Sequence, residues 1–287
     1  MKLLAYQLKQ NSGHGVARRT SISLSHTEFV ALMDADDISE PDRFAKQIPY
    51  FEKGYDVIGG QISEFSNNKV VSYRNVRLSD SDIKSDLKKR CPFNQVSVAF
   101  RKKAYFESGG YIDWFCEEDY YLWIRMFQHG FRFANLPDVL VNVRVDNSMV
   151  KRRGGRRYFL SEKKLQKYLL KEKIINHFQY FINVFKRFVG EIILVKIFPS
   201  LFIKLAHSKK NIYENNPKTI EHIDCNYKFS VCMCVYDGDN PSHFEDSLKS
   251  IFAQTLLPEE LVLVIDGPIN DEIRTVVLKY FKTICNE

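Results

Sequence analysis

Several features that would mark a specialised class of protein are missing from this sequence of 287 residues. It contains only 13 Gly and 9 Pro, and 45% of its residues are hydrophobic, which excludes collagen-like, low-complexity and disordered chains. No run of about 18 apolar residues is free of charge, so no membrane-spanning helix is predicted. Residues 1–15 lack the apolar run and cleavage site of a signal peptide, and none is expected. The composition is that of a globular protein with one large or two small cores.

The six cysteines lack the patterns of a metal or redox site. No two of them form a CxxC pair, and no His lies near them at the spacing of a metal ligand. Cys232 and Cys234 are two residues apart in an apolar run, which places both on one face of a strand. We therefore expect the cysteines to be small buried residues of a protein in a reducing compartment.

The net charge of +7 is concentrated in one segment. Residues 151–210 contain 16 Lys and Arg against 3 Asp and Glu, whereas the rest of the chain contains 26 against 32. A basic segment of this kind usually meets nucleic acid or an anionic membrane surface. No nucleic-acid-binding module is recognisable, so we expect an anionic membrane surface as partner and no nucleic acid.

The same segment is expected to be helical from Ser161 to about Ala206, with Pro199 as an interruption. It carries an apolar stripe made of Phe178, Phe181, Ile182, Phe185, Phe188, Val189 and Ile192. The stripe indicates either a helix packed on the core or an amphipathic helix in a membrane interface. The one-sided charge favours the interface.

The remainder has the pattern of an α/β fold in two parts. In the first part we expect strands at 2–8, 28–33, 55–61, 96–100, 131–134 and 139–145, and helices at 16–25, 41–52 and 118–129. In the second part we expect strands at 229–236 and 261–265, and helices at 246–253 and 271–281. Residues 207–226 are polar and without periodicity, which indicates a linker.

An acidic cluster follows the expected strand 28–33. Asp34, Asp36 and Asp37 stand there, and ligands of open α/β sheets bind at the carboxyl ends of strands. Carboxylates in this position can hold Mg²⁺ or Mn²⁺ together with phosphate oxygens. An acidic surface turn is the alternative interpretation.

Three other carboxylates also have a functional and a structural interpretation. Asp266 ends the strand 261–265, where it can accept a hydrogen bond from the imide N–H of uracil or cap an Asp-Gly turn. Glu118 and Asp119 open the helix 118–129, and the local sequence by itself favours helix capping there.

The motifs resemble those of a known family. Residues 229–236, 247–255 and 260–267 resemble the opening of a family 2 glycosyltransferase of GT-A fold, and residues 11–19, 33–44 and 118–125 resemble its middle and end. The chain as a whole is most similar to bacterial enzymes of exopolysaccharide, capsule or lipopolysaccharide assembly, including the amylovoran type. The resemblance implies an α/β GT-A fold with a Rossmann-like, mostly parallel central sheet.

The order of the motifs is that of a circular permutant. Read from Phe229 to Glu287 and then from Met1 to about Ala206, the chain resembles one complete family member. We therefore expect residues 1–150 to be the C-terminal portion of the catalytic domain and 227–287 its N-terminal portion. A basic helical extension, 151–206, and a linker, 207–226, lie between them. Two truncated tandem copies, completed by exchange between chains, are the competing interpretation.

The resemblance also implies roles for individual residues. The DxD motif of the family falls on this acidic cluster, with Asp34 near the ribose, Asp36 on a divalent metal and Asp37 able to share it. Asp119 matches the general base that deprotonates the acceptor hydroxyl, with Glu118 as its substitute. A nucleotide-sugar site is implied at four positions: Tyr236 on the base, Asp266 at the base, Arg18 toward the nucleotide and Asp34.

These roles describe an inverting, non-processive transferase. We expect a nucleotide-sugar donor, UDP-linked, with Mn²⁺ or Mg²⁺, and a saccharide or lipid-linked acceptor at the cytoplasmic face of the cell membrane. The Gln-x-x-Arg-Trp motif of processive synthases is absent, and Lys151–Gly155 follow the last strand instead. Arg19 stands where many family members have Asn, so the resemblance does not give the local hydrogen bonding there.

Two alternatives stay open. A sugar-phosphate nucleotidyltransferase shares the sheet and the metal carboxylates, but its Gly-rich basic phosphate loop is replaced here by Val235-Tyr236-Asp237-Gly238. A catalytically idle, membrane-associated nucleotide-sugar binding module is the other, if the permuted order loosens the site.

Overall fold

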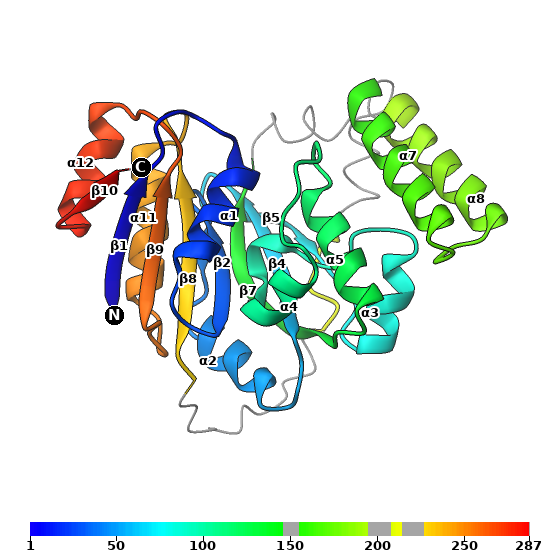
Figure 1. Ribbon diagram of the computed structural model, residues 1–287, viewed down its shortest axis with the longest axis horizontal. Coiled ribbons are helices and arrows are strands. Elements are labelled where there is room, and N and C mark those ends of the chain that lie inside the picture. Colours follow the sequence, from blue (N-terminus) through cyan, green and yellow to red (C-terminus); the bar gives the residue numbers. More distant parts are fainter. Residues whose placement is uncertain (146–154, 195–207, 214–226, 287) are drawn as a thin grey trace.

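The computed structural model describes residues 1–145, 155–194, 208–213 and 227–286. The strands are β1 (Lys2–Gln7), β2 (Phe29–Asp34), β3 (Ile38–Ser39), β4 (Val57–Ser66), β5 (Lys69–Arg74), β6 (Ala99–Arg101), β7 (Phe133–Arg144), β8 (Phe229–Val235), β9 (Glu260–Ile265) and β10 (Ile284–Asn286). They form one sheet in the order β10-β1-β9-β8-β2-β6-β4-β7-β3, and β5 pairs with β4 (Figure 1). The α/β prediction is therefore confirmed.

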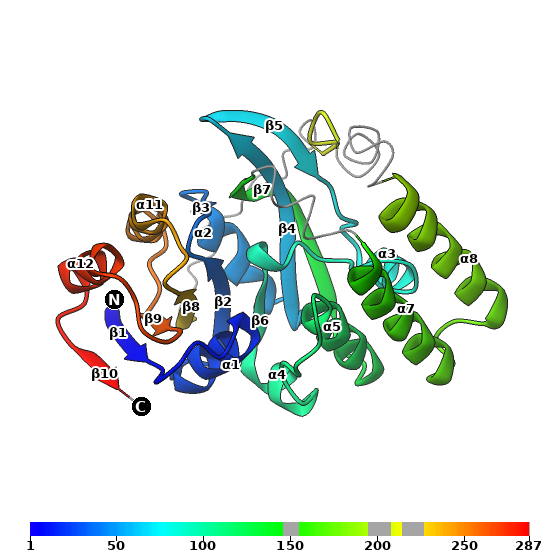
Figure 2. The same ribbon diagram turned by 90° about the horizontal axis from the view of Figure 1, so that it is seen from above.

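The helices are α1 (His14–Leu24), α2 (Arg43–Gln47), α3 (Asp80–Leu87), α4 (Lys102–Glu107), α5 (Glu118–Gln128), α7 (Arg156–Lys171), α8 (His177–Arg187), α11 (Pro241–Phe252) and α12 (Asp271–Tyr280). Short helical turns are η1 (Ile48–Phe51) and η2 (Gln95–Ser97), and η3 (Phe188–Leu194) is a π-helix. Seen from above, α11 and α12 lie at one end of the molecule and α7 and α8 at the other (Figure 2).

The two distant parts of the chain share the central sheet. Strands β8 and β9 lie between β1 and β2, and all three junctions are parallel. Strands buried on both faces read as continuous apolar runs, and β9 is buried along its whole length. In this structure residues 227–286 thus complete, within one chain, the sheet begun by β1 and β2.

The core has two layers, one on each face of the sheet. Helices α11 and α12 bury Phe244, Leu248 and Ile273 against one face. Helices α1, α4 and α5 bury side chains including Ile22 and Trp123 on the other. Truncation of a fully buried aromatic such as Trp123 to Ala costs about 3–5 kcal/mol.

Several expected elements differ from the structure. The single helix expected at 41–52 begins only at Arg43 and ends in a 3-10 turn, since Pro49 in η1 lacks the N–H that continues an α-helix. The two strands expected at 131–134 and 139–145 are one strand, β7, which follows a shifted register along β4. Strand β5 and helices α3 and α4 were not predicted.

The cysteine prediction is partly wrong. Cys232 is buried, and Cys234 lies on the same face of β8, as expected from their spacing. Cys116 and Cys285 are exposed, because they stand in a loop and on the short edge strand β10 rather than in the core. Cys225 lies outside the described residues.

The basic segment forms a separate pair of helices at one end of the molecule. Helix α8 starts with a capping box between Asn176 and Gln179, and Asn183 donates to the Gln166 side chain of α7 at 2.9 Å. Residues 151–154 and 195–206 of the expected extension lie outside the described residues. No helix that the structure describes is long and apolar enough to cross a membrane.

The described part of the expected linker contacts the sheet. Ser208 exchanges two backbone hydrogen bonds with Tyr73 of β5, at 2.8 and 2.9 Å. Asn211 is buried and donates to the Pro137 carbonyl at 3.1 Å. Residues 208–213 are therefore held against the sheet.

Candidate active site

The carboxyl ends of β1, β9, β8 and β2 meet at one edge of the sheet (Figure 1). Asp266 holds two of the loops there together: its Oδ1 accepts from the Ser12 N–H at 2.7 Å, and its Oδ2 accepts from the Gly13 N–H at 2.9 Å. Its own N–H donates to the Val235 carbonyl at 2.8 Å. The structural interpretation of Asp266, as a cap of a turn, is therefore present, and its role at a nucleotide base stays a prediction.

Gly267 makes the close approach of these loops possible. Its φ of 89° lies in the left-handed region, and a Cβ there would lie 2.4 Å from the backbone N of Asn11. Any side chain would push the Ser12–Gly13 turn away from Asp266. This glycine is required by both conformation and space.

Tyr236 lies at the end of β8 and is half exposed. Its ring packs over Gly238, where a Cβ would lie 2.5 Å from the ring. Its backbone N–H donates to Asp239 Oδ2 at 3.0 Å, which fixes the turn. The arrangement leaves an aromatic surface at the edge where the predicted nucleotide base would stack.

Arg18 of α1 connects the two acidic groups of the site. Its Nη2 lies 2.6 Å from Asp34 Oδ1, and its Nη1 lies 4.0 Å from Glu118 Oε1. Burial acts to lower the pKa of the Arg18 guanidinium, but Asp34 outweighs it and the pKa is raised above its ordinary value. Arg18 is therefore a permanent cation at the sheet edge.

Glu118 is paired as well. His14, at the start of α1, lies with Nε2 2.6 Å from Glu118 Oε1. Burial acts to raise the pKa of Glu118, but the His14 hydrogen bond and charge lower it below its usual value. Glu118 is therefore held as an anion by His14 and Arg18.

Asp119 differs from its neighbour. It is enclosed at the start of α5, where Oδ1 accepts from the Tyr120 N–H at 2.6 Å. Burial, followed by the charge of Glu118, raises the pKa of Asp119 to about 6. A carboxylate with this pKa is ionised at neutral pH and is more basic than an ordinary Asp, which suits a general base.

Gln95, which sequence reasoning missed, joins Asp119 to Arg18. In the amide orientation that satisfies both of its polar atoms, Nε2 donates to Asp119 Oδ2 at 2.9 Å. Its Oε1 then accepts from Arg18 Nη1 and from the Tyr111 hydroxyl, each at 2.9 Å. Asp34, Arg18, Gln95 and Asp119 thus form one connected network.

The acidic cluster is not uniform. Asp37 is buried, and its Oδ1 accepts from the Arg144 N–H at 3.0 Å. Burial, then the charges of Asp36 and Asp34, raise the pKa of Asp37 well above its usual value. Asp36 is exposed at the edge. Asp36 is thus the more accessible of the two carboxylates predicted to hold a metal, and Asp37 is a support between β2 and β7.

Asp239 is a further carboxylate at this edge that the sequence motifs did not indicate. Burial raises the pKa of Asp239 to about 6, and the charges of Asp36 and Asp34 act in the same direction. Three carboxylates at the ends of β2 and β8 therefore influence one another electrostatically.

These carboxylates fit a divalent cation that is also held by a diphosphate. No three His, Cys, Asp or Glu side chains in the described residues converge tightly enough to hold a metal by themselves. Mg²⁺ is usually bound through one or two carboxylates plus substrate phosphates and water, which is the donor set available from Asp36 and its neighbours. Burial is the main cause of the raised pKa of Asp239, and the charges of Asp36 and Asp34 add to it. A cation bound here would reduce this repulsion between the carboxylates.

A cavity of about 1070 Å³ connects the predicted catalytic residues to the helical extension. Asp34 and Asp119 line it on one side, and Glu162 of α7, Lys186 of α8 and Glu191 of η3 on the other. Its wall also contains Glu117, whose Oε1 is buried without a hydrogen-bond partner among the described residues. The cavity is large enough for a saccharide acceptor beside Asp119.

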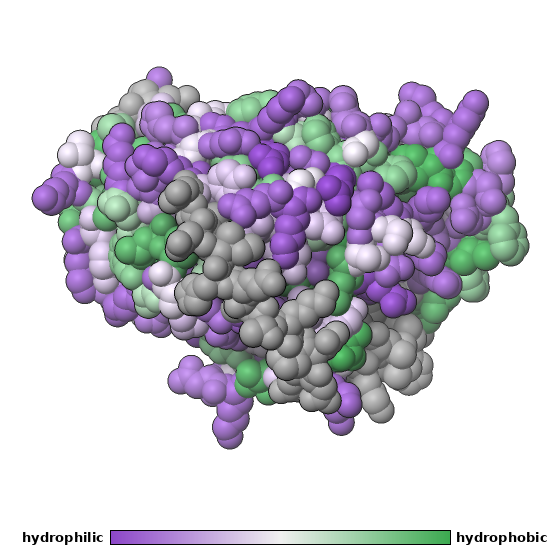
Figure 3. Space-filling view, turned by 90° about the horizontal axis from the view of Figure 1, so that it is seen from below, coloured by the Kyte–Doolittle hydropathy of each residue, from purple (hydrophilic) through white to green (hydrophobic). Residues whose placement is uncertain are grey.

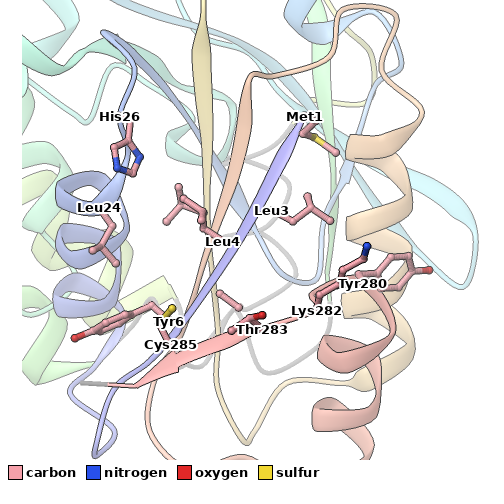
Figure 4. Close-up of a pocket in the computed structure, with 12 residues that line it drawn as sticks. Met1, Leu3, Leu4, Tyr6, Leu24, His26, Tyr280, Lys282, Thr283 and Cys285 are labelled. Carbon is pink, nitrogen blue, oxygen red and sulfur yellow. The ribbon is translucent and has the colours of Figure 1, made fainter.

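A second, largely apolar cavity of about 720 Å³ lies along β1, next to β10 and α12 (Figure 4). Leu3, Leu4, Tyr6, Leu24 and Tyr280 project toward it. It is lined by none of the predicted site residues, so the cavity at Asp119 is the candidate active site.

Comparison with known proteins identifies the fold family. Residues 3–110 match the family model described as glycosyl transferase family 2. A UDP-Gal:alpha-D-GlcNAc-diphosphoundecaprenol beta-1,3-galactosyltransferase of Escherichia coli is 32% identical over 213 residues, which cover 71% of this chain and 74% of that protein. The chain belongs to the family 2 glycosyltransferases, and its α/β sheet is the GT-A fold expected of them.

Two other relatives are more similar over shorter stretches. An uncharacterized glycosyltransferase of Haemophilus influenzae is 45% identical over 159 residues, 54% of this chain and 59% of the relative. The amylovoran biosynthesis glycosyltransferase AmsE of Erwinia amylovora is 38% identical over 173 residues, 60% and 64% respectively. The chain spans about three-fifths of the length of these two relatives. The name of the second confirms the resemblance to the exopolysaccharide type.

Proposed function

We propose that this protein is an inverting glycosyltransferase that moves one sugar from a nucleotide-sugar to a saccharide or lipid-linked acceptor in surface polysaccharide synthesis. Family membership supports the reaction class. The connected network from Asp34 through Arg18 and Gln95 to Asp119 is the observation that carries the proposal. It links the predicted donor side of the site to the predicted base.

The chemical step assigned to Asp119 is proton removal. As the acceptor oxygen attacks the anomeric carbon, the bond from that carbon to the donor phosphate breaks and the nucleoside diphosphate leaves. The proton of the acceptor hydroxyl passes to Asp119, whose pKa of about 6 keeps it ionised at neutral pH. One in-line displacement inverts the anomeric configuration. Glu118, paired with His14, is the weaker candidate because its pKa is lowered.

The donor half of the site is assigned to the sheet edge. Tyr236 offers its ring to the base, and Asp266 lies at the next strand end. Arg18 and Asp34 face the ribose and diphosphate, and a UDP-sugar is the donor we propose. Asp36, with Asp37 behind it, would hold Mn²⁺ or Mg²⁺, which supplies charge neutralisation to the leaving diphosphate when bound.

The acceptor half is assigned to the cavity beside Asp119. The Escherichia coli relative is named for an acceptor on diphosphoundecaprenol, which supports a lipid-linked acceptor here. Lys89 and Lys186 line the same cavity and provide cations for phosphate groups. The absence of a Gln-x-x-Arg-Trp motif supports the addition of a single sugar.

The protein is proposed to work as a peripheral protein on the cytoplasmic face of the cell membrane. Among residues 155–194, the exposed charged side chains are eight Lys and Arg and one acid, Glu172. Such an imbalance attracts an anionic lipid surface.

The order of the segments is proposed to be that of a circular permutant. The placement of β8 and β9 between β1 and β2 supports it, because residues 227–286 and 1–145 then supply complementary parts of one sheet. Size-exclusion chromatography with light scattering tests this arrangement. A monomer is expected, and an obligate dimer would favour exchange of the segments between chains.

The enzymatic proposal is tested by nucleotide release. UDP formation from a panel of UDP-sugars is measured with Mn²⁺ and p-nitrophenyl glycoside acceptors, for the wild type and for Asp36→Ala. Turnover that depends on Mn²⁺ and falls in the variant is expected. Donor binding without any turnover would instead favour the idle nucleotide-sugar module, and release of pyrophosphate from a sugar phosphate and UTP would favour the nucleotidyltransferase.

A further inference from the structure

Helix α8 presents a row of aromatic side chains to solvent. Phe178, Phe181 and Phe185 are 73%, 67% and 66% exposed, and Ile182 and Phe188 are exposed beside them. Their spacing of three and four residues places them on one face of the helix. Figure 3 shows hydrophobic side chains at this end of the molecule, and a contiguous exposed apolar surface of this kind marks an interaction site.

The opposite face of α8 fixes this orientation. Asn183 donates to the Lys88 carbonyl at 2.8 Å and to the Gln166 side chain at 2.9 Å. Arg187 lies 3.1 Å from Glu162 of α7. These polar contacts lie inside the protein, so the helix cannot rotate to bury its phenylalanines without breaking them.

The charge around the aromatic row identifies its partner. The exposed cations of residues 155–194 are Arg156, Arg157, Lys163, Lys164, Lys167, Lys171, Lys173 and Lys186. Two copies of such a surface would repel each other, whereas anionic headgroups attract it. Aromatic side chains on a helix with a basic surround are the composition of a helix that lies in a membrane interface.

We propose that the face of α8 formed by Phe178, Phe181, Ile182, Phe185 and Phe188 inserts into the headgroup boundary of an anionic lipid bilayer. Phe185 and Lys186 also line the cavity that contains Asp119. Insertion therefore places one wall of that cavity at the membrane surface, where a lipid-borne acceptor reaches Asp119 from the bilayer. This last consequence rests on the proposed function, whereas the lipid contact does not.

The test is co-sedimentation with vesicles. The full chain is incubated with vesicles of phosphatidylglycerol mixed with phosphatidylcholine, and with vesicles of phosphatidylcholine alone. The variant Phe178→Ser/Phe181→Ser/Ile182→Ser removes three side chains of the row that do not line the cavity. The matched control, Val70→Ser/Val71→Ser/Phe106→Ser, removes three apolar side chains that are exposed elsewhere.

We expect the wild type and the control to bind the anionic vesicles, and the α8 variant to bind at least about ten-fold less, with an unchanged thermal transition. Equal binding by the α8 variant and the wild type would overturn the proposal. The proposal would also be overturned if the wild type bound no vesicles and formed a dimer, and the α8 variant were a monomer. The aromatic row would then bind a second copy of the chain. The rate of UDP release without vesicles should be the same in both triple variants. An absence of UDP release by the wild type would count against the enzymatic proposal alone.

Discussion

Arg18 Nη2 lies 2.6 Å from Asp34 Oδ1, so an arginine of α1 neutralises the carboxylate that ends β2. The same guanidinium reaches Gln95, which contacts Asp119. The charge of Arg18 also stabilises the anionic form of Asp119. Under the proposed function, the diphosphate of the donor would meet this same cation, and we therefore expect donor binding and base strength to be coupled through one side chain.

Arg18→Met removes that coupling. Arg18 lowers the pKa of Asp119, so its loss should raise this pKa and move the acidic limb of the pH–rate profile to higher pH. The KM for the donor should rise as well. The profile and the donor KM are measured beside Arg19→Met, an exposed neighbour on the same helix. An unshifted limb in Arg18→Met would show that the guanidinium does not act on the base.

The pH dependence of the wild type follows from Asp119. Its raised pKa of about 6 means that the base is protonated, and inactive, as the pH falls through this value. The acceptor-dependent kcat/KM should therefore be constant above about pH 7 and fall tenfold per pH unit well below 6. In Glu118→Gln the loss of a neighbouring negative charge should move the limb to lower pH. A limb near pH 4 in the wild type would contradict the assignment.

Ionisation of Asp119 should affect the stability of the fold in the opposite direction to that of an ordinary salt-bridged Asp. The pKa of Asp119 is raised to about 6 in the folded protein, whereas it is about 4 in the unfolded chain. Stability should therefore fall as the pH rises from about 4 through 6, and the destabilisation should persist at higher pH. Asp119→Asn should therefore raise the midpoint of urea unfolding at pH 7.5 more than at pH 4.5. A variant that is less stable at both pH values would indicate a structural carboxylate.

Arg187 is predicted to be the main stabilising contact between α7, α8 and η3. It lies 3.1 Å from Glu162 and 3.5 Å from Glu191, both buried, and burial raises the pKa of Glu191 to about 8. Arg187→Met leaves the buried carboxyl groups of Glu162 and Glu191 without a cation and should cost about 3–5 kcal/mol of unfolding free energy. Lys186→Met, at the adjacent exposed position, should cost less than about 0.5 kcal/mol. Similar urea midpoints for both variants would disprove the role of Arg187.

Gly267 tests how tightly the loops at the sheet edge must pack. Gly267→Ala brings a Cβ to 2.4 Å from the Asn11 backbone, whereas Gly130→Ala, with a φ of 79°, meets nothing within 4 Å. Both variants carry the strain of a positive φ, about 1–2 kcal/mol. Only Gly267→Ala should also weaken donor binding, measured by calorimetry with UDP and Mn²⁺. Equal affinities of the two variants for UDP would show that the Asp266 turn does not contribute to the nucleotide site.

The sequence predicted most of what depends on local patterns. Continuous apolar runs such as 229–235 and 261–265 indicate buried parallel strands. The motif around Asp34 indicates the carboxyl end of β2, and the motif around Asp119 indicates the start of α5. The family and the α/β fold followed from them and are confirmed. The roles of the individual site residues stay predictions.

Contacts between segments that are distant in the sequence could not be predicted from such local patterns. Gln95 lies in a short 3-10 turn with no motif of its own, and its position between Asp119 and Arg18 arises only when three segments meet. Asp239 belongs to none of the motifs in the sequence, although burial and the charges of Asp36 and Asp34 raise its pKa. The single strand β7 was predicted as two strands, and Pro137 lies between them. An irregular register along β4 accommodates this proline.

The central claim is that Asp119 removes the acceptor proton. The most direct measurement is the acceptor-dependent turnover of Asp119→Asn at pH 8 with UDP-sugar and Mn²⁺, together with calorimetric donor binding and the thermal transition of the same variant. We predict a decrease in kcat of about 10²–10⁴ with donor affinity unchanged and a thermal transition no lower than that of the wild type. Turnover within a factor of about two of the wild type would contradict the account.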